Sequence, residues 1–141
     1  LNKHKLSMSP LDLPALLEKS KGHPVWAEKA ELCYSCGSCN LVCPTCYCFD
    51  VEDELDWNME TGKRTRKWDA CMLTQFAEVA GAHNFRTAKA ARYRHRYYRK
   101  GKYTFDMTGD ISCVGCGRCI TACTANIANP VEVFNRLLET V

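Results

Sequence analysis

Long apolar runs are missing from this sequence of 141 residues. No stretch approaches the roughly 18 consecutive apolar residues that a membrane-spanning helix requires. The first residues also lack the apolar segment that is typical of a signal peptide. The sequence therefore predicts no membrane span. It begins with Leu1 instead of Met, which is compatible with a fragment or a processed form.

Motifs of common enzymes are also missing. There is no GxGxxG opening a βαβ unit and no Walker phosphate-binding loop. The four histidines include none whose position suggests a partner for a nucleophilic cysteine. Since the length fits about one domain, two independent hydrophobic cores are not expected either. We predict that the chain does not catalyse a reaction by itself.

Cysteine, in contrast, is abundant, with eleven residues in the chain. Such a number is typical either of a secreted disulfide scaffold or of an intracellular metal protein. An odd count fits a fully paired disulfide framework poorly. We therefore expect a reducing, cytoplasmic location and a role in metal binding.

Eight of the cysteines form one repeat with identical spacing, "CYSCGSCNLVC" at 33–43 and "CVGCGRCITAC" at 113–123. Each copy reads C-x2-C-x2-C-x3-C, and Gly37 corresponds to Gly117. The members of the two copies are Cys33, Cys36, Cys39 and Cys43, and Cys113, Cys116, Cys119 and Cys123. A period of 80 residues is too long for a solenoid. It indicates a duplicated half-site with a long insertion between its halves.

This spacing is typical of a protein that holds two [4Fe–4S] clusters. A tight loop can present three thiolates to three irons, and in the bacterial two-cluster pattern the fourth cysteine binds the other cluster. The glycines let the backbone approach the cluster closely. The predicted ligand sets are Cys33, Cys36, Cys39 and Cys123 for one cluster, and Cys113, Cys116, Cys119 and Cys43 for the other. One departure is that Pro44 follows Cys43 whereas Thr124 follows Cys123.

Three cysteines, Cys46, Cys48 and Cys71, lie outside the repeat. One interpretation makes them small buried side chains beside the clusters. The other makes them ligands of a third metal site, with Asp69 or His83 as a fourth ligand. The spacing alone does not decide between these interpretations.

Several segments together resemble a known family. They are "LVCPTCYCFDVED", "KRTRKWDAC", "FAEVAGAHNFR" and "CVGCGRC". They resemble the β (or A) subunits of cytoplasmic sulfhydrogenases and anaerobic sulfite reductases over about residues 30–128. The resemblance implies a two-cluster ferredoxin-type domain that relays electrons between a flavin subunit, which meets a nicotinamide cofactor, and a catalytic subunit.

We expect an α+β fold with a bacterial two-cluster ferredoxin-like core and a single domain over 1–141. Its expected parts are a helical lead-in at 1–32, the first motif at 33–48, an insertion at 49–110, the second motif at 111–128 and a C-terminal helix at 129–141. Within them, the patterns predict helices at about 10–20, 24–32, 68–80 and 85–100, and a hairpin that turns near Gly62. Gly81 and Gly101 are expected to end the third and fourth of these helices. The last helix is expected to bury Val133, Phe134, Leu137 and Leu138.

Residues 86–102 form a basic segment that contains eight Lys or Arg and no acid, leaving 11 basic against 16 acidic residues in the rest of the chain. We expect an exposed face or a surface for docking other subunits, because complementary charge orients redox partners. A nucleic-acid surface is the less favoured interpretation. His83 and His95 are expected at the surface or in the core, not as ligands. The expected apolar cover of the clusters comprises Leu32, Tyr34, Leu41, Val42, Val114 and Ile120.

The sequence thus predicts an electron-transfer subunit with two [4Fe–4S] clusters in an anaerobic redox complex. Its expected partners are flavin-containing and catalytic subunits, with no nucleic acid and no membrane span. Two alternatives stay open at this point. One is a free soluble ferredoxin, and the other is a zinc-stabilised module that binds nucleic acid.

Overall fold

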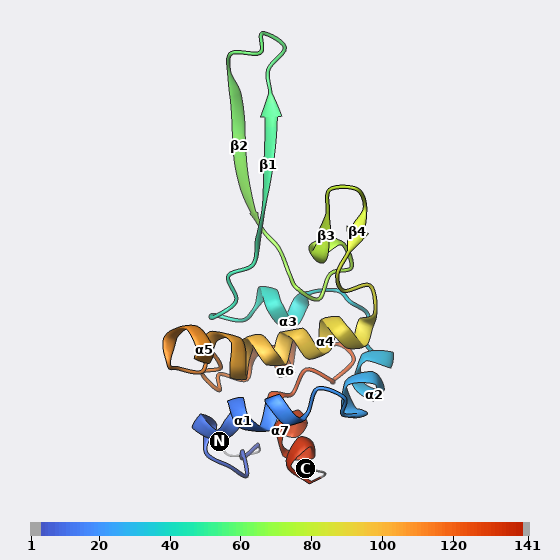
Figure 1. The fold of residues 1–141 in the computed structure, drawn as a ribbon, viewed down its shortest axis with the longest axis vertical. Helices are drawn as coiled ribbons and strands as arrows, with labels where there is room; N and C mark the ends of the chain where they lie inside the picture. Colours follow the sequence, from blue (N-terminus) through green and yellow to red (C-terminus); the bar gives the residue numbers. More distant parts are fainter. Residues whose placement is uncertain (1–3, 140–141) are drawn as a thin grey trace.

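The computed structural model describes residues 4–139 and shows a helical body from which two antiparallel hairpins project (Figure 1). The structure is therefore mixed α and β, with the helices carrying the core. In chain order the elements are η1 (Pro10–Asp12), α1 (Leu13–Lys19), α2 (Val25–Glu31), α3 (Ser38–Leu41), β1 (Phe49–Leu55), β2 (Gly62–Trp68), η2 (Gln75–Ala77), β3 (Glu78–Val79), β4 (His83–Asn84), α4 (Lys89–Tyr98), the π-helical turn η3 (Arg99–Tyr103), α5 (Thr104–Thr108), α6 (Arg118–Ala122) and α7 (Pro130–Leu138).

The first two helices lie where the sequence patterns predict them. Ser9 caps η1, since its hydroxyl oxygen accepts a hydrogen bond from the Leu11 N–H at 3.4 Å, and Pro10 occupies the first turn. Helix α2 begins directly after Pro24 and ends at Glu31. Proline is favoured at such starts because its φ angle is already helical and it lacks a donor that would need a partner. Together these two helices deliver the chain to Cys33.

Helix α4 runs through the centre of the body and supplies much of its core (Figure 1). Tyr93 and Tyr97, one helical turn apart, are each only 1% exposed. The Tyr93 hydroxyl donates to the carbonyl oxygen of Ile127, and the Tyr98 hydroxyl donates to that of Leu17 at 2.6 Å. A buried phenol needs such a partner. The tyrosines of the basic segment are therefore structural and do not form an exposed aromatic surface.

The prediction of an exposed basic segment at 86–102 is wrong for half of the helix. Arg92, Arg96 and Lys100 are 3%, 4% and 7% exposed. They lie four residues apart and so share one face of the helix. That face points into the body, towards the cysteine-containing loops. Three of the eight Lys or Arg side chains of this segment are therefore withdrawn from the surface, and the other five are exposed or partly exposed.

Gly101 does not end this helix. The chain continues through η3 into α5, which ends at Gly109 in the left-handed conformation with φ of 81°. Gly101 is buried, and a Cβ atom at this position would lie 2.8 Å from Cδ1 of Leu17. The glycine thus permits close packing of η3 on α1, and it is not a helix stop.

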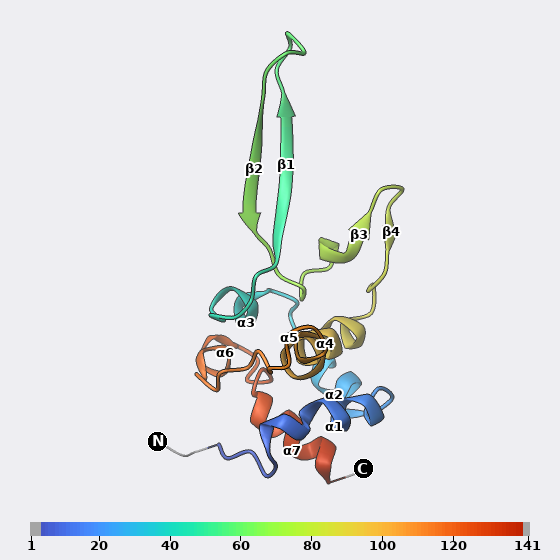
Figure 2. The ribbon, with the colours of Figure 1, turned by 60° about the vertical axis from the view of Figure 1, so that its left-hand side comes forward.

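Strands β1 and β2 form a long hairpin that extends away from the body along the longest axis of the molecule (Figures 1 and 2). Phe49 pairs with Trp68 at its base and Leu55 with Gly62 at its far end, so the turn occupies 56–61. Exposed ion pairs join the strands, including Arg64 to Asp53 at 2.6 Å. The two termini lie at the opposite end of the molecule (Figure 2).

The helix predicted for 68–80 is wrong. Trp68 ends β2, and the chain then makes turns, the short 3-10 helix η2 and the strand β3. Gly81 lies in the turn between β3 and β4, with φ of 83°. The apolar spacing in this segment comes from Ala70, Cys71 and Met72, which are buried in consecutive positions of a turn. Their burial is set by contact with the first cysteine loop and not by a helical face.

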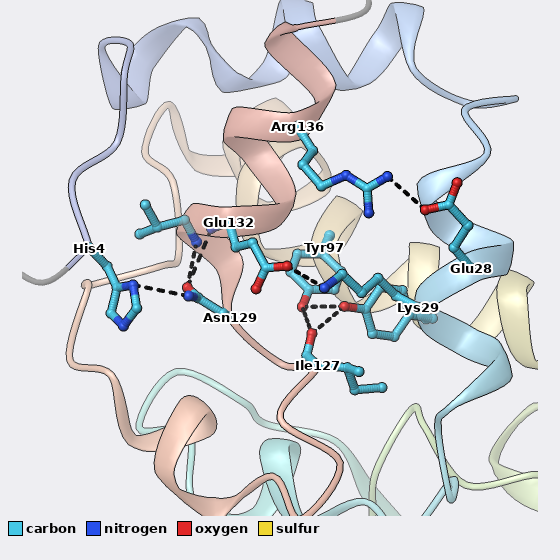
Figure 3. Close-up of polar contacts among 10 residues, drawn as sticks. His4, Glu28, Lys29, Tyr97, Ile127, Asn129, Glu132 and Arg136 are labelled. Carbon is cyan, nitrogen blue, oxygen red and sulfur yellow. Dashed lines mark hydrogen bonds and ion pairs between the residues drawn. The ribbon is translucent and has the colours of Figure 1, made fainter.

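Helix α7 packs against the body through Val133, Phe134 and Leu137, while Leu138 is only partly buried. The side-chain oxygen of Asn129 caps it, accepting from the Val131 N–H at 3.1 Å (Figure 3). Ion pairs add contacts to α2, namely Arg136 to Glu28 at 2.6 Å and Lys29 to Glu132 (Figure 3). The predicted helix extended to Val141, and its last two residues lie outside the described residues. Within residues 4–139, no helix is long and apolar enough to cross a membrane.

Candidate functional site

The two cysteine motifs adopt the same backbone conformation. Gly37 and Gly117 precede α3 and α6, and both have φ of 74°. Two residues earlier, Ser35 and Gly115 also have positive φ, 54° and 64°. Such angles favour glycine, because a Cβ atom is strained there. The repeat in sequence is therefore a repeat in structure, with each motif curling into a tight loop before a short helix.

The repeat continues past each fourth cysteine. The Cys46 N–H donates to the carbonyl oxygen of Cys43 at 3.2 Å, and the Asn126 N–H donates to that of Cys123 at 3.0 Å. Helices α3 and α6 contact each other, which brings the two half-sites face to face. Each fourth cysteine consequently lies beside the loop of the other motif.

The first predicted ligand set lines one pocket. Cys33, Cys36 and Cys39 from the first motif meet Cys123 from the second, around an open space of about 380 Å³. Tyr93, Met72 and Ile127 contribute apolar lining. The Cys39 thiol is close enough to Cys123 and Cys33 for their charges to interact, although burial is the main reason that its pKa rises to about 11.

The second predicted set lines another, wider hollow. Cys113, Cys116 and Cys119 from the second motif meet Cys43 from the first, in a space of about 2030 Å³ including its open mouth. Burial raises the pKa of Cys119, which interacts electrostatically with Cys113 and Cys43. The structure thus brings together both crosswise sets of four thiols. All eleven cysteines are free thiols.

Two buried cations lie beside the second hollow. Arg96 and Lys100 both line the second hollow, and Lys100 Nζ donates to the Thr45 hydroxyl at 2.7 Å. Burial lowers the pKa of Arg96, but Cys39, Tyr97, Cys119 and Cys46 together more than offset it, so that this pKa stands above its usual value. Among residues 4–139 neither cation forms an ion pair with a carboxylate. Since a buried charge is costly without a partner, the sulfur atoms are the available anions.

A third cation holds the first loop in place. Arg92 Nη2 donates to the Ser35 hydroxyl at 3.1 Å, and its Nη1 donates to the carbonyl oxygens of Arg86 and Thr87. Ser35 is one of the residues with positive φ. Helix α4 therefore supports the conformation of this loop with a charged hydrogen bond. The sequence analysis did not identify Arg92, Arg96 or Lys100, although their spacing of four residues was the available signal.

The remaining cysteines lie together at the base of the long hairpin. Cys46, Cys48 and Cys71 line a third pocket of about 290 Å³, which Arg96 and Lys100 also line. Hydrogen bonding from the Cys71 thiol lowers the pKa of Cys48 to about 6, and bonding from Cys46 lowers that of Cys43 to about 3.

The two expected candidates for a fourth ligand differ in position. Asp69 is near Cys48, since its N–H donates to the Cys48 carbonyl oxygen at 3.0 Å and its charge acts to raise the pKa of Cys48. His83 is exposed in β4 and does not line the pocket. No group of three or more His, Cys, Asp or Glu side chains within the described 4–139 is arranged to hold one metal ion.

The predicted apolar cover is correct in part, since Tyr34 lines the first pocket and Val114 and Ile120 line the second hollow. Five of its six members are exposed: Leu32, Tyr34, Leu41, Val42 and Val114. Ile120 alone is partly buried. Further apolar contacts of the first pocket come from Tyr93, Met72, Ile127 and neighbouring residues. Sequence reasoning placed the whole cover next to the cysteines along the chain, whereas the fold adds residues from distant elements.

Comparison with known protein families agrees with this geometry. Residues 32–127 match the model of the 4Fe-4S dicluster domain. The chain belongs to the 4Fe-4S dicluster domain family. The match spans both cysteine motifs and the whole segment between them, so the hairpins and α4 lie inside this dicluster domain.

The chain is also similar to the sulfhydrogenase 2 subunit beta of Pyrococcus furiosus, with 40% identity over 135 residues. The alignment covers 96% of this chain but only 39% of that subunit. No solved structure gives a significant match. The iron–sulfur subunit resemblance stated from the sequence is thus confirmed.

The residues present fit iron–sulfur clusters. Thiolates are the usual ligands of such clusters, and each pocket of the dicluster domain presents four thiols from two loops. The unpaired buried cations beside them fit clusters that carry negative charge together with their thiolates. This agreement rests on the donor set and its electrostatic surroundings.

Proposed function

We propose that this chain relays single electrons through two [4Fe–4S] clusters in a multisubunit redox complex. One cluster is held by Cys33, Cys36, Cys39 and Cys123, and the other by Cys113, Cys116, Cys119 and Cys43. The observation that carries the proposal is that each of these sets, drawn from both motifs, lines a single pocket. When bound, such a cluster supplies a centre that gains or loses one electron at a time.

The chain's own residues prepare the two pockets in different ways. The loops that contain Gly37 and Gly117 hold the thiols, and Arg92 fixes the first loop through Ser35. Tyr93 and Met72 keep water from the inner side of the first pocket. Arg96 and Lys100 offset the negative charge of the second set. Ligand geometry, solvent exclusion and charge are the means by which a protein sets cluster potentials.

We further propose that the partners are a flavin-containing subunit linked to nicotinamide and a catalytic subunit of a hydrogenase- or sulfite-reductase-like complex. The similarity to a sulfhydrogenase beta subunit supports this assignment. The exposed apolar residues beside the motifs, including Tyr34 and Val114, also favour burial against another subunit over a free soluble ferredoxin. Exposed apolar residues become contiguous surface, which is typical of an interface, only where they gather on one face.

The zinc-stabilised nucleic-acid module finds less support. Its surface was expected in residues 86–102, where Arg92, Arg96 and Lys100 are buried and face thiols or loop carbonyls. Phosphate binding needs accessible cations. The anaerobic and cytoplasmic setting remains part of the proposal, because iron-bound thiolates require a reducing environment.

The test is the iron and acid-labile sulfide content of anaerobically purified variants. C123S and C43S should each lose about four irons and four sulfides relative to the unchanged chain. The crosswise assignment makes a sharper statement about pairs. C33S/C123S should lose no more than either single variant, because both ligands serve one cluster, whereas C43S/C123S should lose about eight irons. If C33S/C123S lost twice as much as C33S, the crosswise assignment would be wrong, and zinc without sulfide would overturn the relay.

A further inference from the structure

The two halves of the cysteine repeat differ at three positions that lie together in the fold. Counting 80 residues onward, Asn40 corresponds to Ile120, Cys46 to Asn126 and Cys48 to Ala128. At these three positions the first half thus has one amide and two thiols. The second half has an isoleucine, an asparagine and an alanine, and so no thiol. All three residues of the first half line the third pocket together with Cys71, which lies just beyond the long hairpin.

The geometry directs all three thiols into this pocket. Cys46 and Cys48 both line the pocket from the segment that leads into β1. At the base of the hairpin, the Asp69 N–H donates to the Cys48 carbonyl oxygen at 3.0 Å, which brings Cys71 beside Cys48. The Cys71 thiol donates a hydrogen bond to Cys48. The long hairpin between them therefore brings Cys48 and Cys71, which are 23 positions apart in sequence, next to each other.

The side chain of Asn40 lies between the sulfurs. It is 3% exposed, and its Nδ2 donates to Sγ of Cys71 at 3.2 Å and to Sγ of Cys46 at 3.6 Å. N–H groups aimed at sulfur stabilise a thiolate. The two sulfurs thus flank one amide nitrogen, and within residues 4–139 no three such side chains converge on a point that could hold a single metal ion. This spacing fits a cluster, in which each thiolate binds a different iron.

The charge around the pocket is positive. Arg96, Arg99 and Lys100 line it, and no carboxylate of residues 4–139 does, although Asp69 lies beside Cys48. Arg96 Nη1 lies 3.9 Å from Sγ of Cys46. Three neutral thiols, or a neutral disulfide between Cys48 and Cys71, would leave these cations without an anionic partner on this side. A net negative group in the pocket would balance them.

From these observations we propose that Cys46, Cys48 and Cys71 bind a third iron–sulfur cluster at the base of the hairpin. The inference rests on the proposed function, since it assumes that the chain is loaded with clusters in a reducing environment. The pocket, about 290 Å³, is on the scale of the 380 Å³ pocket lined by the first ligand set. Three thiolates bind three irons, and the fourth iron takes a ligand other than a cysteine of this chain. The Cys46 thiol donates a hydrogen bond to Cys43, which places the third site directly beside the second.

The experiment measures iron, acid-labile sulfide and zinc per chain on the full chain purified without oxygen. The unchanged chain should contain about twelve irons, and C71S should lose about one third of its iron and sulfide. C46S/C48S should lose the same third, and C46S/C71S no more than C71S alone. A70S, which alters the fully buried neighbour of Cys71 and keeps every thiol, is the matched control and should retain full iron.

Additivity distinguishes this inference from the relay itself. C71S/C123S should lose two thirds of the iron, because its two ligands serve different clusters. The unchanged chain could instead contain about eight irons, with the same content in C71S and in C46S/C48S. That result would overturn the third site but leave the relay intact. A zinc ion that disappears with Cys71 overturns the iron–sulfur assignment of this pocket. If C123S and C43S retain full iron, the relay fails, whatever Cys71 does. C46S/C48S, at partly exposed positions, keeps the test decisive if C71S does not fold.

Discussion

Nη1 of Arg96 lies 3.9 Å from Sγ of Cys46, and the same guanidinium forms a hydrogen bond with Cys119. Cys46 closely follows the four cysteines of the first motif, and the charge of Arg96 also acts on Cys39 within that motif. Arg96 is 4% exposed and has no carboxylate partner in the described part of the chain. A single buried cation is thus the electrostatic link between the two halves of the repeat.

Replacing Arg96 with Gln should make the cluster reduction potentials more negative. A reduced cluster has one more negative charge, and the buried cation stabilises that state more than the oxidised one. Loss of about 1–3 kcal/mol of this stabilisation corresponds to a shift on the order of 50–130 mV for one electron. The measurement is a redox titration followed by electron paramagnetic resonance.

Arg94 provides the matched control for this shift. It lies on the same helix, but its guanidinium donates to the Lys21 carbonyl oxygen and does not line the cysteine pockets. R94Q should change the potentials by less than about 20 mV, because solvent screens its charge. Equal shifts in R94Q and R96Q would contradict the role given to Arg96.

Gly101→Ala should destabilise the fold. The added Cβ would lie 2.8 Å from Cδ1 of Leu17, which is fully buried. Overpacking of this kind costs about 1–3 kcal/mol, and the higher helix propensity of Ala offsets up to about 1 kcal/mol of it. We expect a net loss of about 1 kcal/mol in urea unfolding. Gly22→Ala, where a Cβ meets nothing within 4 Å, should be close to neutral.

More of the candidate site than of the fold could be predicted from the sequence. Cysteine spacing alone led to the two crosswise sets, because ligand geometry restricts which spacings can hold a cluster. Helix starts at Pro10 and Pro130 were also predicted, since proline and a capping side chain act locally. These features depend on neighbours in sequence, or on a repeat that is visible in it.

The errors share one physical cause, which is that burial depends on partners distant in sequence. From the sequence, Arg96 and Lys100 were expected at the surface. The number of basic residues in a segment does not reveal that thiols distant in sequence face these two side chains. The segment after Trp68 has helical spacing, but Cys71 and Met72 are buried by packing in a turn. Gly101 was assigned to a helix end, although it serves close packing on Leu17. Tertiary context overrode local propensity in each case.

Asn129→Ala should lower stability by about 1 kcal/mol, the usual cost of losing a helix N-cap. Its side-chain oxygen accepts from the N–H groups of Val131 and Glu132, at 3.1 and 3.4 Å. Asn129→Asp keeps that acceptor and adds a charge that suits the helix start. Urea unfolding of both variants should therefore separate them, with N129D close to the unchanged protein. Equal losses would mean that the contact of Asn129 with His4, and not the cap, is what matters.

His95→Gln should make stability less dependent on pH between about 6.5 and 4. Burial, together with the charge of Arg86, lowers the pKa of His95 to about 4 in the folded chain, below the ordinary 6.5. Between these values the unfolded chain takes up a proton that the folded chain does not, so the contribution of neutral His95 is complete above pH 6.5 and is lost as the pH falls towards 4. Because the ring is partly exposed, the loss from pH 7 to pH 5 should be about 1 kcal/mol. Urea unfolding at both pH values should show this loss in the unchanged chain but not in H95Q. The control is H83Q, which should show the same loss as the unchanged chain because His83 is exposed in β4. If H95Q lost as much stability as H83Q between pH 7 and pH 5, another group would be responsible for the acid sensitivity.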